Sequence, residues 1–452
     1  MNKINLGSLK IAVGTAMVLP LAALISPIDA VAQSAPTSCN DVLQNCPLDR
    51  TPNLTQVQIA PVLSTITING QTITVNPPPT DGSPAEVTAT AITSSSTGIG
   101  NNISASSSNG VLLDLVSTQD LSASVGAVND ITTTAAVPGV ILATTTAYGN
   151  TAQAQTCCGG MDVIADQSIS AAAGTVSANG ILNTAPGVGT LSMTTSAVSN
   201  VVGAAAINGA VSLVTNQNND AGLNATSTAV MCCNNDSASI SATATSNSSQ
   251  SSSASSTVYS WAAQNNRGAI DATAMLSVNS GTAISSAAQA TANVASAYNN
   301  WGYTELSTAQ HAEGPVSSHA ILTANNFVSS ATAGTTSQGN LAILSGMGSD
   351  GRINAYQNIT ATSDVIAVTD WSGFSQGGVG TAIASASGNG LTGFVCTICG
   401  QAGVGLYGNV EQLNGGNVSA TVNMSGGTSA SIVASATAVG NSANFITQAG
   451  AN

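Results

Sequence analysis

An asparagine that closes a Ser/Ala/Thr-rich run returns along this 452-residue chain at intervals of 40 to 53 residues. A glycine precedes it at five positions, and Ser199, Ser246 and Asn299 replace the glycine at the other three. The asparagines are Asn101, Asn150, Asn200, Asn247, Asn300, Asn340, Asn389 and Asn441. A glutamine follows 17 or 18 residues after five of them, at Gln119, Gln167, Gln217, Gln264 and Gln357. Two markers in phase predict a repeat architecture in which each unit packs on its neighbours.

The units themselves show the alternation of β-strands. In residues 237–245, Ala238, Ile240, Ala242 and Ala244 alternate with Ser and Thr, which predicts a half-buried strand. We expect turns at the Gly-Asn pairs, and stacked Asn and Gln side chains that bond from one rung to the next. A unit of about 49 residues suits two turns of a slender solenoid, so eight units predict roughly sixteen rungs. The short interval from Asn300 to Asn340 predicts an irregular unit.

The chain divides into three parts. Residues 1–32 have the pattern of a signal peptide, residues 33–84 form an N-terminal segment, and residues 85–452 are predicted to be an all-β, elongated β-solenoid of about eight repeats. Residues 64–75 alternate around Asn69 and Gly70, which predicts a β-hairpin with a type I′ turn. A stiff, Pro-rich spacer follows it at residues 76–84, with three prolines in a row at 77–79. The hairpin is expected to cap the stack or, alternatively, to serve as a docking tag.

The first residues predict export. Lys3 and Lys10 form a basic end, residues 11–25 are apolar, and residues 30–32 (Ala-Val-Ala) form a small-residue cleavage site. The apolar stretch is too short, and too rich in proline around it, for a membrane span. The protein is therefore expected at the cell surface, in association with the outer membrane.

Charge limits the partners of the mature chain. The formal net charge is −14, and after the leader only Arg50, Arg267 and Arg352 carry a fixed positive charge. Nucleic acid is excluded as a partner, because phosphate binding depends on Lys and Arg. Most of the polarity comes from neutral Ser, Thr, Asn, Gln and Gly, which favours self-association.

Eight cysteines remain after the leader, and an even number in an exported protein favours disulfides. They are Cys39, Cys46, Cys157, Cys158, Cys232, Cys233, Cys396 and Cys399. Spacing suggests that Cys39 pairs with Cys46 and Cys396 with Cys399, and that the two vicinal pairs cross-link to each other. Cys396 and Cys399 also fit a zinc or redox motif, but a single such motif is weak, and neither a metal nor a cofactor is predicted.

Catalytic groups are scarce. His311 and His319 are the only histidines, and no Gly-x-Ser-x-Gly sequence supports a nucleophile, so the prediction is a non-enzymatic protein. Two rival classes remain open. A polysaccharide-degrading β-helix would need paired acids such as Asp364 and Asp370, and an ice-binding solenoid would need a regular Thr-x-Thr array on one flat face.

The aromatic side chains are the candidate binding groups. They gather near Asn, Gly and Gln in the second half of the chain, as Tyr259, Trp261, Tyr298, Trp301, Tyr303, Trp371 and Phe374. Flat rings beside hydrogen-bonding groups suit the faces of sugars or a protein partner. Alternatively, the rings fill gaps where the repeat is irregular.

The leader, the Asn- and Gln-phased Ser-Ala-Thr repeats and the closing segment 440–452 resemble curlin-type surface proteins. More narrowly, the chain length and the long repeat resemble the holdfast anchor protein D group of stalked alphaproteobacteria. This chain differs from curlin in two ways: its repeats are about twice as long, and it has four cysteine pairs. The resemblance implies export through a curli-type secretion channel, surface attachment with other anchor proteins, and tethering of an adhesive polysaccharide to the cell envelope. A curli-like functional amyloid subunit that self-assembles is the alternative.

Overall fold

The computed structural model describes residues 54–70, 73–74, 86–87, 91–108, 110–134, 136–184, 187–348, 350–375, 377–397, 405–427 and 431–449. The predicted leader, Cys39, Cys46 and the Pro-rich spacer lie outside these residues. The described chain is nearly all strand, with one short 3-10 turn at Ala171–Ala173. None of its helical segments is long and apolar enough to span a membrane.

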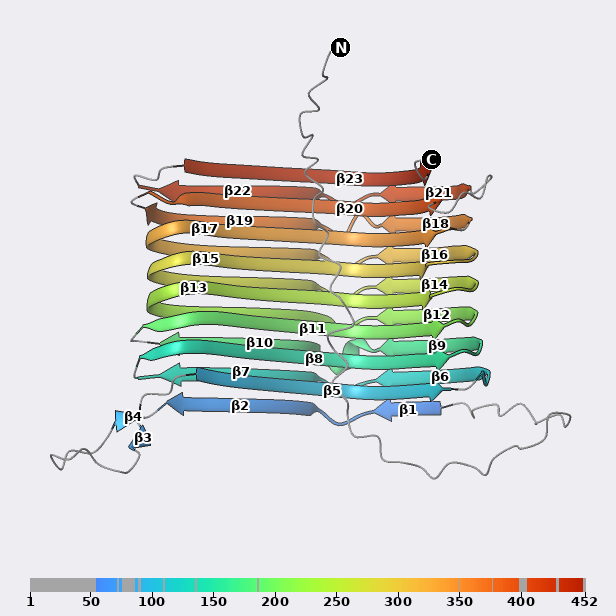
Figure 1. Ribbon diagram of the computed structural model, residues 1–452, viewed down its shortest axis with the longest axis horizontal. Helices are drawn as coiled ribbons and strands as arrows, with labels where there is room; N and C mark the ends of the chain where they lie inside the picture. Colours follow the sequence, from blue (N-terminus) through green and yellow to red (C-terminus); the bar gives the residue numbers. More distant parts are fainter. Residues whose placement is uncertain are drawn as a thin grey trace, which may run out of the picture. The chain divides into compact units, whose positions relative to one another are not determined.

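One parallel sheet contains eight short strands, and Figure 1 shows them stacked in chain order. They are β1 (Leu54–Gln58), β6 (Leu113–Leu121), β9 (Met161–Ile169), β12 (Val211–Asn219), β14 (Val258–Asn266), β16 (Thr304–Ala312), β18 (Gly351–Ile359) and β21 (Leu406–Asn414).

A second parallel sheet contains thirteen strands in two layers. Its short layer is built from β2 (Val62–Gly70), β7 (Val125–Thr133), β10 (Thr175–Thr184), β19 (Val365–Ser375), β22 (Val418–Gly426) and the first parts of β13 (Gly222–Ser253), β15 (Ile270–Asn299) and β17 (Val316–Met347). We call the other layer the long segments: β5 (Ala91–Ser107), β8 (Val137–Cys157), β11 (Val188–Ile207), residues 237–253 of β13, 283–299 of β15 and 330–347 of β17, β20 (Val379–Thr397) and β23 (Ser431–Ala449).

One sequence repeat forms one complete turn of this solenoid-like fold. Gln167 of β9 lies opposite Gln217 of β12, and Asn150 of β8 lies opposite Asn200 of β11. Each turn runs along a strand of the eight-stranded sheet, a strand of the short layer and a long segment. The prediction of two turns per unit is therefore wrong. The period alone did not show that a single segment such as β8 would use 21 residues in one extended run.

The core is thin and rich in alanine. One part lies between the short layer and the first halves of the long segments, and includes Ala178, Ala225 and Ala272. The other part lies between the eight-stranded sheet and the second halves, and includes Leu115 and Ala262. Small side chains let the two layers approach closely at the packing density of a protein interior.

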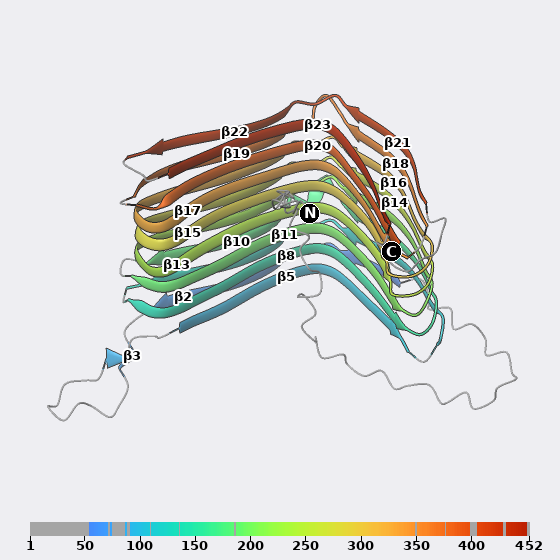
Figure 2. The ribbon, with the colours of Figure 1, turned by 45° about the horizontal axis from the view of Figure 1, so that its top comes forward.

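The two parts of the core meet at the repeated asparagines, where each long segment changes from one part to the other. Figure 2 shows the bend in each rung. In β8, Gly149 and Asn150 are both buried, so two consecutive residues face the core. A Cβ at position 149 would come within 2.5 Å of Ile169 Cδ1, which explains the glycine. The expected turns at the Gly-Asn pairs are thus wrong, because the buried asparagine side chain supplies its own hydrogen bonds within a continuous strand.

The predicted N-terminal hairpin is also wrong. β2 continues through Asn69 and Gly70 as a parallel partner of β7, with Asn69 opposite Thr132. The only antiparallel pair among the described residues joins β3 (Ile73–Thr74) to β4 (Glu86–Val87). Pairing with the next rung extends the parallel sheet, which stabilises β2 more than a two-stranded hairpin would.

Candidate functional site

A row of asparagines, buried in all but the last rung, runs through the bend of every long segment. Each Nδ2 donates to the Oδ1 of the next asparagine, as from Asn200 to Asn247 at 2.9 Å, and also to a backbone carbonyl of the eight-stranded sheet, as from Asn200 to Asn218 O at 3.0 Å. The row consists of Asn101, Asn150, Asn200, Asn247, Asn293, Asn340, Asn389 and Asn441. Asn300, one of the predicted members, lies instead in an exposed position after β15, and Asn293 takes its place.

A second row of amides, buried except for its half-buried end members, runs along the eight-stranded sheet. Each glutamine Nε2 donates to the Oε1 of the preceding glutamine, as from Gln264 to Gln217 at 2.8 Å. The row consists of Gln56, Gln119, Gln167, Gln217, Gln264, Gln310, Gln357 and Gln412. Because Gln310 follows Asn293 by 17 residues, the irregular unit predicted after Asn300 does not exist. Both rows are scaffold, and they fix which side chains align on the outer faces.

Two aligned columns on the outer face of the eight-stranded sheet bring aromatic and polar groups together. The first column lies five residues before each glutamine of the row and contains Tyr259, Glu305, Arg352 and Tyr407. The second lies three residues before it and contains Trp261, Ser307, Asn354 and Asn409. The sequence prediction included Tyr259 and Trp261 but missed Arg352, Asn354 and Tyr407, which the spacing to the glutamines would have aligned.

A shallow pocket of about 470 Å³ lies over these columns at β16, β18 and β21. Its lining residues are Tyr303, Asp350, Arg352, Asn354, Tyr407, Gly408 and Asn409. The Tyr303 ring packs at a tilt against the Tyr259 ring, with centroids 5.8 Å apart, and so extends the aromatic surface beyond the pocket. Tyr407 is 64% exposed and Trp261 45%, so both rings are open to a ligand.

The polar groups of the pocket are already oriented. Tyr303 Oη donates to Glu305 Oε2 at 3.0 Å, and Asp350 Oδ1 accepts from Gly405 N at 2.6 Å. Burial, followed by the neighbouring Glu305 carboxylate, raises the pKa of Tyr303, so this hydroxyl stays a hydrogen-bond donor at neutral pH. Arg352 Nε lies 4.0 Å from Glu305 Oε1 and is half exposed, which leaves most of its guanidinium donors free for a ligand.

The other predicted rings lie elsewhere. Trp371 of β19 is 1% exposed, with its Nε1 donating to Ala331 O at 3.1 Å, so it belongs to the core and not to a binding surface. Phe374 of β19 is exposed but lies on the thirteen-stranded sheet. Tyr298 lies on a long segment, and Trp301 lies in the turn after β15 against Gly348. The structure thus brings together Tyr259, Trp261 and Tyr303 and separates the remaining four.

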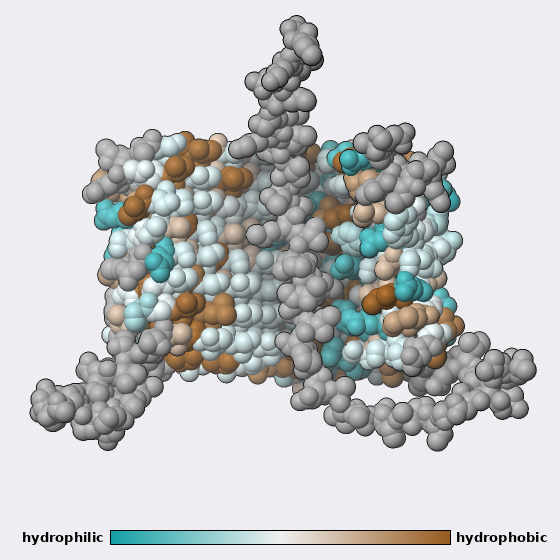
Figure 3. All heavy atoms as spheres, in the orientation of Figure 1, coloured by the Kyte–Doolittle hydropathy of each residue, from teal (hydrophilic) through white to brown (hydrophobic). Residues whose placement is uncertain are grey.

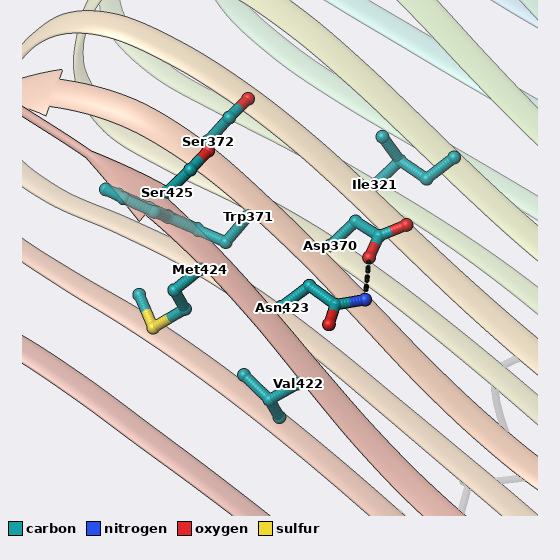
Figure 4. A pocket seen from close by; sticks show the side chains of 8 residues that line it. All are labelled: Ile321, Asp370, Trp371, Ser372, Val422, Asn423, Met424 and Ser425. Atoms are coloured by element: carbon teal, nitrogen blue, oxygen red, sulfur yellow. Dashed lines mark hydrogen bonds between the residues drawn. The ribbon is translucent and has the colours of Figure 1, made fainter.

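A second open pocket, of about 560 Å³, surrounds Asp370 on the short layer (Figure 4). Asp370 accepts hydrogen bonds from Asn423 Nδ2 at 2.8 Å and pairs with His319 Nε2 at 2.7 Å. Burial acts to raise the pKa of Asp370, but these two partners outweigh it and lower the pKa. Asp364 is six residues away along an extended chain, about 20 Å, whereas paired glycosidase carboxylates lie about 5 to 9.5 Å apart. The acids named for a polysaccharide-degrading enzyme are therefore not a catalytic pair.

The vicinal cysteines cannot cross-link as expected. Cys157 lies seven residues after Asn150 and Cys232 lies fifteen residues before Asn247, so they are at opposite ends of the long segments. A disulfide needs Cα atoms within about 7 Å. Instead, the Cys157 and Cys158 Sγ atoms lie 2.7 Å apart in an exposed turn. Cys396 is buried, and Cys399 lies outside the described residues. The described part of the chain holds no group of three or more His, Cys, Asp or Glu placed to bind a metal.

Comparison with known proteins adds the family. The family model of holdfast attachment protein D matches residues 86–362, from β4 through the turn after β18. No curated protein and no solved structure matches the chain. Because the matched residues make up more than half of the chain and include most rungs, the chain belongs to the holdfast attachment protein D family.

Proposed function

We propose that this protein is an exported, outer-membrane-associated anchor that binds the adhesive holdfast polysaccharide and holds it to the cell envelope. Its family is one of holdfast-associated cell-surface proteins. The single observation that supports polysaccharide as the ligand is the aromatic and amide surface around Tyr303, Arg352 and Tyr407.

Sugar rings carry one apolar face and a rim of hydroxyl groups. The exposed rings of Tyr259, Trp261 and Tyr407 offer flat apolar area. Asn354 and Asn409 offer side chains that donate and accept at once, as sugar hydroxyls do. This surface spans four neighbouring rungs from β14 to β21, so it suits several linked sugar units.

Variants of the two exposed rings test this proposal. Trp261→Ala and Tyr407→Ala should each weaken binding of the protein to adhesive polysaccharide isolated from the culture medium by about fivefold, since a lost ring contact is worth about 1 kcal/mol. Phe374→Ala removes an exposed ring on the other sheet and should leave binding unchanged. Equal binding by all three variants and the wild-type protein would exclude this surface as the ligand site.

The proposed anchor has protein partners as well. We place export through a curli-type secretion channel and assembly with other surface anchor proteins in this proposal, since both follow from the family resemblance. Deleting the channel should leave the protein inside the cell, where protease treatment of intact cells does not reach it.

A self-assembling, curli-like subunit is the second candidate, and the end rungs favour it. Among the described strands, β1, β2 and β5 pair only with the following rung, and β21, β22 and β23 only with the preceding one. Open parallel edges are templates for further strands. Light scattering of the purified mature protein decides this question: growth of mass with concentration supports stacking, and a constant monomer mass excludes it.

A further inference from the structure

The outer face of the long segments is almost free of charge. Residues 91–107, 137–157, 188–207, 237–253, 283–299, 330–347, 379–397 and 431–449 contain no Asp, Glu, Lys, Arg or His. Asp236 is the exception, exposed at the bulge of β13 where its long segment begins. The other charged and histidine residues of 91–449 lie on short strands or in turns, although the chain has a formal net charge of −14.

Hydroxyl and amide groups form continuous columns on the same face. The clearest column lies four residues before the asparagine row, where all eight members are polar and uncharged. They are Thr97, Thr146, Ser196, Thr243, Gln289, Thr336, Ser385 and Thr437. Thr146 is buried, and the other seven are half-buried or exposed. Figure 3 looks onto this face, and most of its surface is pale, the colour of Ser, Thr and Gly.

The bend in the long segments shapes this outer face. In Figures 1 and 2 the long segments lie in front of the short strands and recede at the bend. The two halves of the face are therefore inclined toward each other, and the angle between them follows the row from rung to rung. Adjacent rungs repeat about every 4.8 Å. Such a face is suited to an extended polymer that runs along the stack.

We propose that this nearly charge-free face binds an uncharged segment of polysaccharide lying lengthwise across the rungs. The inference rests on the proposed function and adds a second, longer contact to the aromatic surface. Neutral sugars are favoured because binding them removes no charged group of this face from water, which is the costly step when an ion is buried. Hydroxyl and amide side chains donate and accept, so they match sugar hydroxyls directly or through water.

The face also has apolar area of the kind that a sugar ring covers. Val140 and Leu142 are exposed near one end of the stack, and Ile383 near the other. An ice surface is the competing occupant, because hydroxyl rows on a flat sheet are its requirement. The column two residues further from the bend is interrupted by Ala287, Gly334 and Ile383, which breaks a regular Thr-x-Thr array. A sugar polymer tolerates this irregularity better than a crystal lattice does.

Affinity electrophoresis of the mature protein tests the inference with two polymers of one backbone. Hydroxyethylcellulose is neutral and carboxymethylcellulose is anionic. We expect hydroxyethylcellulose to retard the wild-type protein at least tenfold more strongly. Thr243→Asp and Thr336→Asp, which place a carboxylate on the exposed side of the long segments, should each lower that affinity about tenfold. Thr228→Asp makes the same change on the short layer and should have no effect.

Several results would overturn the inference. They are unchanged affinity in the two long-segment variants, absence of retardation by hydroxyethylcellulose, or stronger retardation by carboxymethylcellulose. Thermal hysteresis that Thr243→Asp abolishes would assign the face to ice. If Trp261→Ala and Tyr407→Ala weaken binding of the isolated adhesive polysaccharide while the long-segment variants do not, the proposed function stands and this inference alone fails.

Discussion

Replacing Asn293 by alanine should destabilise the fold strongly, although this asparagine is not preceded by glycine and does not stand out in the sequence. Its side chain is fully buried. Asn293 Oδ1 accepts from Asn247 Nδ2 at 2.9 Å, and its Nδ2 donates to His311 O and Asn340 Oδ1 at 2.8 Å each. Alanine would remove all three of these buried bonds, and of the partners only Asn247 Nδ2 would keep a second bond, to Asn265 O.

The expected loss follows from those three bonds. A buried group left without its hydrogen-bond partner costs about 1 to 3 kcal/mol. Relaxation of the chain and entry of water recover part of this cost, so we expect Asn293→Ala to lower the free energy of unfolding by about 3 to 5 kcal/mol. Asn300→Ala is the matched control. Asn300 is exposed, and its substitution should change stability by less than about 0.5 kcal/mol.

Urea denaturation followed by circular dichroism measures both variants. Because stacked repeats can unfold in parts, hydrogen exchange should accompany the urea experiment. It should show a loss of amide protection centred on β15 and its neighbours. Equal destabilisation by Asn293→Ala and Asn300→Ala would refute the assignment of the asparagine row. So would a stability of Asn293→Ala within 0.5 kcal/mol of the wild type, about the limit for a surface site.

Three further predictions concern the packing and the pH response. Gly149→Ala should cost about 1 to 3 kcal/mol, because its Cβ would lie 2.5 Å from two neighbouring atoms, whereas Gly334→Ala meets nothing within 4 Å and should be neutral or slightly stabilising in thermal melts. Trp371→Ala should cost about 3 to 5 kcal/mol in urea denaturation, while Trp261→Ala, on the surface, should cost far less; similar losses would contradict the placement of Trp371 in the core. Burial raises the pKa of Tyr148 from 10.0 to about 12, so the protonated form stabilises the fold below pH 10 and this contribution falls as pH rises from 10 to 12. Alkaline titration of Tyr148→Phe should show a smaller loss of stability over that range than the wild type, and identical curves would count against the shift.

The all-β class and the amide rows could be predicted from the sequence because both rest on local periodicity. Alternation in residues 237–245 identified a strand. The spacing from Asn200 to Gln217 recurs in other repeats, which identified the two amide rows. The path of the chain within one repeat could not be predicted. Whether a buried asparagine stands in a turn or in a bent strand depends on partners such as Asn218 O, which lie on another strand.

The candidate site was predictable only in part, for a related reason. Tyr259 and Trp261 stood out as aromatic residues, but their partners Arg352 and Tyr407 are one repeat or more away in the sequence. Choosing Asn300 as a marker in place of Asn293 shifted one unit by seven residues and concealed this alignment. The glutamine row continues through Gln310 without a break. Counting residues back from each glutamine therefore recovers the alignment of the aromatic and polar columns. Trp371 was misassigned because composition does not distinguish a ring that fills the core from one that meets a ligand.

The most direct test of the central claim is how much adhesive polysaccharide remains on cells that lack this protein. The polymer should be made in normal amount but released into the medium, and the wild-type gene should restore its retention. The gene carrying both Trp261→Ala and Tyr407→Ala should fail to restore retention even when the variant reaches the cell surface at the wild-type level. Normal retention of the polysaccharide by cells without the protein would contradict its role as an anchor.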